Sequence, residues 1–149
     1  MVKIGIKIRV SAIIFDSKGL VLTKHFVKGF GEYFLLPGGG LEKGEDPIEA
    51  LKRECKEEIG VDIWVERLVY YKSAYSDEDT YLDLIFLCKP LSNNFKVSPE
   101  EQNVKGVVFI KNEEELKKIN FFPKQIIQRI YQPLPISAEF LGKVKYPEE

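Results

Sequence analysis

The sequence has little cysteine or histidine and lacks long hydrophobic runs, and each scarcity excludes a class of protein. The two cysteines, Cys55 and Cys88, have no metal-ligand spacing and lie in apolar patterns. This favours buried free thiols in a reducing cytoplasm over a disulfide. No run of about 18 apolar residues is present, and the N-terminus alternates instead of forming a signal-peptide core. We therefore expect a cytoplasmic protein without a membrane segment. The one histidine, His25, is interpreted as a loop residue and not as a catalyst.

An excess of charge of either sign is also missing. The 149 residues include 22 Lys and Arg against 23 Asp and Glu, which gives a net charge of −1. Such a chain has no bulk attraction to nucleic acid or to a membrane surface, so any recognition of phosphate must be local. The length fits a single domain over residues 1–149, which can bury roughly two-thirds of the unfolded chain's surface without disulfides.

Hydrophobic periodicity predicts a mixed α/β sandwich in which helices flank a sheet. Apolar and basic residues alternate from Lys3 to Val10, with Ile4, Ile6 and Ile8 on one face, and this half-buried strand continues to Asp16. Further strands are predicted at Leu20–Phe26, Phe30–Leu36, Asp62–Tyr71, Thr80–Lys89 and Val104–Ile110, and helices at Asp46–Gly60, Glu113–Lys118 and Pro123–Tyr131. The stretch PGGGLEKGED, residues 37–46, is too rich in glycine to predict regular structure.

The helix predicted at Asp46–Gly60 has clear ends and an acidic side. Asp46 is a good N-cap with Pro47 after it, Glu49 completes a capping-box-like pair, and Gly60 supplies a left-handed stop. At about 100° per residue the apolar residues form one narrow stripe that must be buried. Its members are Ile48, Leu51, Cys55 and Ile59.

Three glutamates, Glu54, Glu57 and Glu58, crowd the sector beside that stripe, and Glu58 lies closest to it. Like charges three and four residues apart cost a few tenths of a kcal/mol per pair in an isolated helix. The crowding makes sense if divalent cations neutralise the carboxylates, and hard oxygen ligands favour Mg²⁺ or Mn²⁺ over zinc. A solvated acidic face is the alternative interpretation.

The segment Gly39–Val61 joins the glycine-rich stretch to this helix. It reads Gly, five residues, Glu, seven residues, then Arg-Glu-apolar-x-Glu-Glu-x-Gly-apolar, and its chance probability is on the order of 10⁻⁷. The segment resembles the complete Nudix box, and the chain resembles a Nudix (MutT-like) hydrolase over most of its length. This resemblance implies an α/β fold, the α/β/α sandwich with a mixed β-sheet.

The resemblance also implies the activity and the roles of individual residues. It implies a Mg²⁺-dependent hydrolase, with Mn²⁺ as a substitute, that cleaves a diphosphate (pyrophosphate) linkage in an NTP, an ADP-ribose-like compound or a dinucleoside polyphosphate. The metal ligands would be Gly39, Glu54, Glu57 and Glu58. The catalytic residues would be Arg53, Glu54 and Glu57, with a general base that is either one of the helix glutamates or a glutamate outside the box, for which our first candidate is Glu101. Glu100 is a second candidate for that base, and both loop glutamates have solvated charges as their alternative interpretation.

The substrate-binding residues include the glycines and the partner of Arg53. Arg53 can hold a carboxylate through a bidentate fork, with Glu45 as the partner that the resemblance implies. The glycines allow close backbone approach to a phosphate or metal. The full set is Gly38, Gly39, Gly40, Glu45 and Tyr75. Aromatic residues in predicted loops are candidates to stack on a base, although such residues more often pack in a core. They are Phe26, Phe30, Tyr33 and Tyr75.

The same fold would also admit two other functions. A non-catalytic nucleotide-binding Nudix-like domain would be expected to lack box glutamates, yet all are present. An isomerase would need further acid/base residues, such as a cysteine in a pocket, whereas Cys55 lies in the apolar stripe of the helix.

The C-terminal residues 132–149 carry the period of a strand with one buried face. After two prolines, apolar and polar residues alternate from Ile136 to Tyr146. We expect an edge strand on the chain's own sheet or on that of a second subunit. The second arrangement would make a homodimer whose tail borders the substrate pocket.

Overall fold

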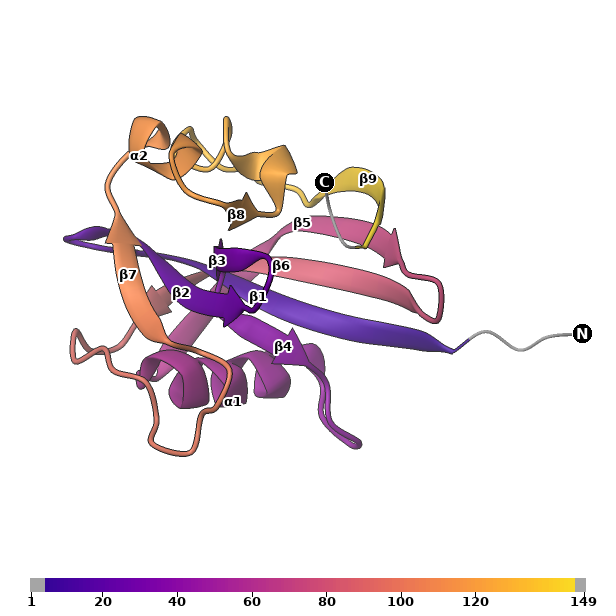
Figure 1. Cartoon of the computed structure of the whole chain (residues 1–149), viewed down its shortest axis with the longest axis horizontal. Helices are drawn as coiled ribbons and strands as arrows, with labels where there is room; N and C mark the ends of the chain where they lie inside the picture. Colours follow the sequence, from indigo (N-terminus) through magenta and orange to yellow (C-terminus); the bar gives the residue numbers. More distant parts are fainter. Residues whose placement is uncertain (1–4, 147–149) are drawn as a thin grey trace, which may run out of the picture.

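The computed structural model describes residues 5–146. Their strands form one mixed sheet, and two α-helices and a 3₁₀ turn pack on its two sides (Figure 1). The strands are β1 (Ile6–Asp16), β2 (Gly19–Val27), β3 (Gly31–Leu35), β4 (Gly38–Gly40), β5 (Ile63–Tyr75), β6 (Thr80–Pro90), β7 (Gly106–Ile110), β8 (Phe121–Phe122) and β9 (Glu139–Lys145). The helical elements are α1 (Pro47–Ile59), α2 (Glu113–Lys117) and the 3₁₀ turn η1 (Lys124–Ile126). Lys3 and Ile4 of the first predicted strand lie outside the described residues.

The sheet is built around β1. Along Ile6–Ile14 this strand pairs in parallel with β6, and on its other edge Arg9–Ser11 pair antiparallel with β4. Its end forms a hairpin with β2, from which the sheet continues through β3 to β8, while β5 and β9 extend the opposite side. Parallel and antiparallel pairs thus occur in one sheet, so the predicted mixed sheet is confirmed.

Two hydrophobic cores pack on opposite sides of the sheet, and β1 contributes to both. Val10, Ala12 and Ile14 pack with the apolar stripe of α1, whereas Ile13 packs with Leu116 and the segment that follows it. This division follows from the period of two in a strand, which sends neighbouring side chains to opposite faces. In Figure 1, α1 lies below the sheet, and α2 with the segment after it lies above. The predicted α/β fold with helices flanking a mixed sheet is confirmed.

The predicted ends of α1 are confirmed. The Asp46 side chain accepts the backbone N–H of Glu49 at 2.8 Å, Pro47 occupies the first turn, and Gly60 ends the helix with φ 76°. Each feature satisfies or avoids an unpaired backbone group at a helix end. As a result, α1 is held in a fixed rotation, with Ile59 in the core and Glu58 beside it.

The glycine-rich stretch contains a strand, so the prediction of irregular structure at Gly38–Gly40 is wrong. β4 is short and lies between β1 and α1. A Cβ at Gly38 would clash with the backbone of Val10, and one at Gly39 would come within 2.5 Å of Glu54 Oε1. Glycine is required because the strand passes this close to its neighbours.

The predicted helix Pro123–Tyr131 is also wrong, although its buried residues are those expected. Ile126 and Ile130 are buried four residues apart. However, the backbone bonds from Ile126 to Pro123, from Ile127 to Lys124 and from Arg129 to Ile126 span three residues. One bond, from Ile130 to Ile126, spans four residues, and it is not continued. The segment is therefore a 3₁₀ turn followed by further turns.

The start of β1 is more exposed than the alternation predicts. Ile6 is 63 % exposed, while Val10 is 2 % exposed. In Figure 1 the first residues of β1 extend past the end of α1, so no helix covers them.

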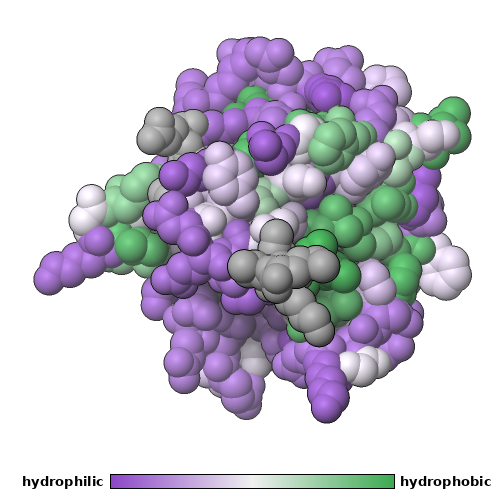
Figure 2. Space-filling view, turned by 90° about the vertical axis from the view of Figure 1, so that its right-hand side faces the viewer, coloured by the Kyte–Doolittle hydropathy of each residue, from purple (hydrophilic) through white to green (hydrophobic). Residues whose placement is uncertain are grey.

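The surface is mainly polar on the face seen from the right-hand side of Figure 1, with hydrophobic residues gathered in a smaller area of that face (Figure 2). Among residues 5–146, no helix has the length and the apolar character needed to cross a membrane.

Candidate active site

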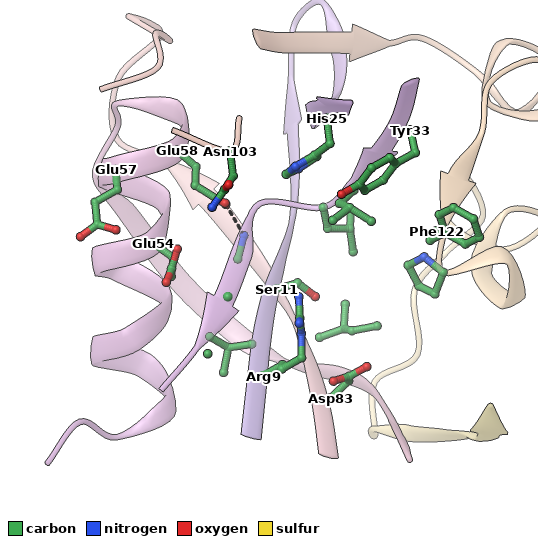
Figure 3. Close-up of a pocket in the computed structure, with 18 of the residues that line it drawn as sticks. Arg9, Ser11, His25, Tyr33, Glu54, Glu57, Glu58, Asp83, Asn103 and Phe122 are labelled. Carbon is green, nitrogen blue, oxygen red and sulfur yellow. Dashed lines mark hydrogen bonds between the residues drawn. The ribbon is translucent and has the colours of Figure 1, made fainter. Parts of the chain in front are cut away.

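A cavity of about 970 Å³ opens where β1, β4 and α1 meet the strands of the other half of the sheet. Side chains of α1 lie on one side of it, and aromatic side chains of β3 and the segment around Phe122 lie on the other (Figure 3). Strand β1 lies between these sides and contributes Arg9 and Ser11. The cavity therefore joins the glutamate face of α1 to residues far away in the sequence.

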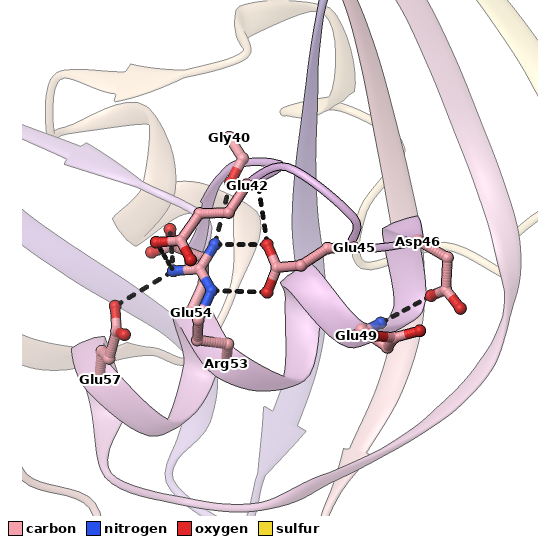
Figure 4. Close-up of polar contacts among 8 residues, drawn as sticks. All are labelled: Gly40, Glu42, Glu45, Asp46, Glu49, Arg53, Glu54 and Glu57. Carbon is pink, nitrogen blue, oxygen red and sulfur yellow. Dashed lines mark hydrogen bonds and ion pairs between the residues drawn. The ribbon is translucent and has the colours of Figure 1, made fainter.

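Arg53 connects the loop before α1 to the carboxylates of the helix (Figure 4). Its Nε and Nη2 donate to the two carboxylate oxygens of Glu45 at 2.8 and 3.0 Å, which is the expected bidentate contact. Nη2 also donates to the Gly40 carbonyl at 3.1 Å, and Nη1 donates to Glu54 at 3.0 Å and Glu57 at 3.4 Å. The hydrogen bonds to Glu45 raise the pKa of Arg53 further, so the guanidinium stays charged.

Glu58 and Glu54 are carboxylates with little solvent around them. Glu58 is 7 % exposed, and its Oε1 accepts the N–H of Gly38 at 2.7 Å. Burial raises the pKa of Glu58 to about 8, and the Gly38 hydrogen bond offsets part of the rise. Burial likewise raises the pKa of Glu54, against the opposing effect of Arg53. Glu57 is different, since 48 % of its side chain is exposed. Raised pKa values of this origin mark carboxylates whose burial is not fully offset by positive charge.

The residues present fit a hard divalent cation. Glu54, Glu57 and Glu58 line the cavity and offer only oxygen donors, which is the set that Mg²⁺ and Mn²⁺ prefer. Gly39 keeps β4 free of a side chain, where a Cβ would touch the Glu54 carboxylate. Within residues 5–146, no three Asp, Glu, His or Cys side chains are already arranged closely enough to coordinate one metal ion. Arg53 and the Gly38 N–H hold the three carboxylates instead, and a bound cation would take over part of these contacts.

The two loop glutamates proposed as bases lie in different places. Glu101 lines the cavity, and its Oε1 accepts the N–H groups of Asn103 at 2.8 Å and Val104 at 3.3 Å. Its negative charge contributes to the raised pKa values of Glu54 and Glu58, behind the larger effect of burial. Glu100 accepts a hydrogen bond from the Ser98 hydroxyl and is not among the cavity residues. The structure thus brings Glu101 to the site and leaves Glu100 outside it.

His25 is on strand β2 and lines the cavity, so its interpretation as a loop residue is wrong. It is 7 % exposed, its Nε2 lies 2.8 Å from the Thr23 hydroxyl, and its ring stacks on Tyr33 at 5.1 Å. Burial lowers the pKa of His25, which favours the neutral imidazole. The signal in the sequence was the alternation Val21, Thr23, His25, which places the three side chains on one face of a strand.

Of the four aromatic candidates, two line the cavity and two do not. Phe30 and Tyr33 line the cavity, and their rings meet edge to face at 6.0 Å. Phe26 and Tyr75 are not among the cavity residues, and Tyr75 lies at the end of β5 with Lys143 over its ring. Phe122, which the sequence did not single out, lines the cavity as well.

The C-terminal strand completes the cavity from within the same chain. β9 pairs in parallel with β5, so the tail forms an edge strand on the chain's own sheet. The predicted buried face of this strand is wrong, because Ile136 is 90 % exposed and Phe140 is 54 % exposed at the edge of the sheet. Just after β9, Tyr146 donates from its hydroxyl to Asp83 Oδ2 at 2.6 Å, and Lys72 Nζ lies 3.7 Å from the same oxygen. All three residues line the cavity, and Lys72 and Asp83 are buried. No short motif marks them, because they meet only through strand pairing.

Comparison with known proteins agrees with this geometry. The sequence model of the NUDIX domain matches residues 5–130. Structures similar to this chain include a NUDIX hydrolase from Nitrosomonas europaea, with 21 % identity, a TM-score of 0.69 and coverage of 83 % of this chain and 85 % of that chain. An ADP-ribose pyrophosphatase from Streptococcus suis has 18 % identity, a TM-score of 0.65 and coverage of 93 % and 98 %. The MutT protein from Methanosarcina mazei has 18 % identity, a TM-score of 0.70 and coverage of 87 % and 96 %. No curated protein sequence matches the chain.

Proposed function

Because this chain belongs to the NUDIX domain family, we propose that it is a Mg²⁺-dependent hydrolase that cleaves a diphosphate linkage in a nucleotide-like substrate. The observation that carries the proposal is the set of three carboxylates, Glu54, Glu57 and Glu58, facing one cavity beside a strand of glycines. A solvated acidic face would not bury Glu58 to 7 % exposure or bring it against the backbone of β4.

The helix glutamates and Gly39 would hold the cation. When bound, Mg²⁺ or Mn²⁺ neutralises charge on the phosphate oxygens and lowers the pKa of an attacking water. Arg53 keeps Glu54 and Glu57 close to each other through Nη1, and its fork on Glu45 fixes the guanidinium against the helix. The chain's residues thus fix the positions and charges of the site before substrate binds. Positioning and electrostatic stabilisation supply most of the rate enhancement in phosphoryl transfer.

Glu101 is the general base in this proposal. It lines the cavity on a loop that is held by its own contacts to Asn103 and Val104, so its second oxygen, Oε2, is left to accept a proton from water. Glu100 lies outside the cavity. His25 is buried and stacked on Tyr33, which suits a supporting role in the wall better than proton transfer.

The nucleotide end of the substrate would occupy the aromatic side of the cavity. Phe30, Tyr33 and Phe122 line that side, and stacking of a base on an aromatic ring contributes roughly 1–3 kcal/mol. Relatives with the same fold include an ADP-ribose pyrophosphatase and a MutT protein. Their names support a nucleoside diphosphate derivative as substrate and leave NTPs, ADP-ribose-like compounds and dinucleoside polyphosphates as the classes to compare.

The isomerase alternative has little support at this cavity. Cys55 and Cys88 are free, buried and not among the cavity residues. Burial raises the pKa of Cys88 to about 12 and that of Cys55 well above its ordinary value, so neither forms a thiolate near neutral pH. Two buried free thiols also agree with a reducing compartment, and we place the protein in the cytoplasm.

A panel of substrates tests the proposal. Purified protein is incubated with ADP-ribose, 8-oxo-nucleotides and diadenosine polyphosphates, with Mg²⁺, with Mn²⁺ or with a chelator, and the products are separated by chromatography. We expect cleavage of at least one compound at its diphosphate linkage, in the presence of metal only. Metal-dependent nucleotide binding without turnover would support the non-catalytic domain instead.

A further inference from the structure

We infer that Arg9 binds a phosphoryl group of the substrate and is a positioning residue outside the Nudix box. This inference rests on the proposed function, since it assigns the contact that holds the part of the diphosphate away from the helix carboxylates. It involves binding only and adds no covalent step.

Strand pairing places Arg9 in the middle of the site. On one edge of β1 its Cα is opposite Gly40 of β4, and on the other edge it is opposite Asp83 of β6. Neighbouring strands lie about 4.8 Å apart, so Arg9 is one strand away from the glycine strand and one strand away from Asp83. Val10 points into the core under α1, and the alternation of the strand therefore sends Arg9 to the cavity side. Figure 3 shows its side chain extending between the helix glutamates and Asp83.

Arg9 differs from the other cations of the cavity in its contacts. Arg53 is committed to the carboxylates of Glu45, Glu54 and Glu57. Lys72 lies 3.7 Å from Asp83, which also accepts the Tyr146 hydroxyl. Among residues 5–146, no carboxylate lies within ion-pair distance of Arg9, although Asp83 is its neighbour in the next strand.

The positive charge of Arg9 nevertheless lowers the pKa of two other residues that line the cavity. Burial is the main cause of the raised pKa of Glu58, and the positive charge of Arg9 opposes it. Burial is also the main cause of the lowered pKa of His25, and Arg9 lowers it further. Arg9 thus supplies a positive potential beside the carboxylates without being neutralised by one of them.

These properties match a phosphoryl group better than any other part of the proposed substrate. A guanidinium donates two parallel hydrogen bonds to phosphate oxygens, and Arg9 is exposed at the cavity, where a ligand can reach it. A cation held by Glu54, Glu57 and Glu58 would engage one phosphoryl group, and Arg9 is one strand away from the glycine strand beside it. This arrangement lets a chain with a net charge of −1 attract phosphate locally.

The test measures binding separately from turnover. Arg9→Ala and Arg9→Lys are compared with the wild type by calorimetry, first with Mn²⁺ alone and then with α,β-methylene-ADP in the presence of Mn²⁺. Lys7→Ala is the matched control, because Lys7 is a cation on the same strand that pairs with Asp79 at 3.0 Å and is not among the cavity residues.

We expect Arg9→Ala to weaken the binding of α,β-methylene-ADP roughly 10- to 100-fold, as for the loss of a charged hydrogen-bonding contact. Mn²⁺ affinity should stay within about twofold of the wild type, Arg9→Lys should be intermediate, and Lys7→Ala should be unchanged. The wild-type dependence of this binding on salt should flatten in Arg9→Ala. Wild-type binding of the nucleotide by Arg9→Ala, with turnover of the panel intact, would overturn the role of Arg9 and leave the proposed function standing. An inactive wild type that binds Mn²⁺ but no nucleotide would overturn the proposed function itself.

Discussion

Glu57 and Glu58 share one face of α1 but differ in exposure, and both are expected to be essential for turnover. Replacing either with Gln keeps its size and removes its charge, and this should lower metal-dependent kcat by two or more orders of magnitude. Glu114→Gln is the control, because it makes the same change on an exposed residue of α2. Far-ultraviolet circular dichroism should be the same for all variants. Wild-type kcat for Glu57→Gln or Glu58→Gln at saturating Mg²⁺ would contradict the metal site.

The raised pKa of Glu58 leads to a pH dependence of stability. The unfolded chain releases the proton of this carboxyl near its ordinary pKa of 4.5, and the folded chain releases it near 8. Between these values the folded state binds more protons, so the free energy of unfolding decreases as pH rises through the window. Its contribution is complete below pH 4.5 and lost above pH 8, and Glu54 shifts in the same direction.

The measurement is the urea midpoint from pH 5 to pH 9 with a chelator present. The midpoint of the wild type should fall across this range, and that of Glu58→Gln should fall less. Excess Mg²⁺ should reduce the fall, because the cation stabilises the ionised carboxylate. The lowered pKa of His25 acts in the opposite direction in both proteins, so the comparison of the two isolates Glu58. If the midpoint of the wild type falls no more than that of Glu58→Gln between pH 5 and pH 8, Glu58 is not protonated in the folded protein.

Some residues of the site were predictable from the sequence and others were not, for a physical reason. Glu54, Glu57 and Glu58 are close in sequence and share a helix face, so the helical period alone brings them together. Arg9 and Asp83 are 74 positions apart and meet through the parallel pairing of β1 with β6. No local pattern encodes such a pairing, and these residues could be identified only once the register was known.

At the scale of the element, the proposal implies that cation binding to the glutamates of α1 stabilises the folded protein. Mg²⁺ or Mn²⁺ should raise the melting temperature, by roughly 5–10 °C at a hundred times the dissociation constant. At neutral pH and without metal, Glu58→Gln should be more stable than the wild type, because the wild type must take up a proton on Glu58 or bury its charge when it folds. The variant should gain less when metal is added. The test is a thermal titration of both proteins. Equal metal-induced shifts would exclude α1 as the binding face.

The elements differ in how well their sequences encode them. The ends of α1 follow from Asp46, Pro47 and Gly60, whose side chains or backbone act within one turn of the helix. β4 was missed because three glycines have no strand preference of their own, and their strand exists only through contact with β1 and α1. Propensity describes a segment in isolation, so it fails where packing decides the outcome.

At the scale of the whole molecule, the C-terminal strand connects the edge of the sheet to the cavity. Deleting residues 134–149 removes β9 and the Tyr146 contact with Asp83. The loss of a hydrogen bond to a buried charge alone costs about 1.5–3 kcal/mol. We therefore expect a lower melting temperature and a higher KM.

Light scattering and amide exchange complete this test. The deletion should leave the mass per particle unchanged, since β9 pairs with β5 of its own chain. Amides of β9 in the intact protein should exchange slowly. Fast exchange throughout the tail, together with unchanged stability after the deletion, would contradict its docking.

The fold as a whole was largely predictable, because alternating strands, one capped helix and the box all indicate the same architecture. The assignment of the tail to its own sheet was not, since alternation indicates a strand and does not identify the strand with which it pairs. Tyr146 reaches the cavity only because β9 runs parallel to β5.

The pairing of β4, β1 and β6 also gives the site a fixed length. Gly40, Arg9 and Asp83 stand in one row across three hydrogen-bonded strands, which spans about 10 Å. The spacing of this row is fixed, because it is set by backbone hydrogen bonds and does not change when a loop moves. The distance from the scissile linkage to the groups recognised near Asp83 should then be a property that substrates must match. Adding one phosphate to the linker between the scissile linkage and the group near Asp83 should therefore weaken binding of a ligand more than a chemical change in that group.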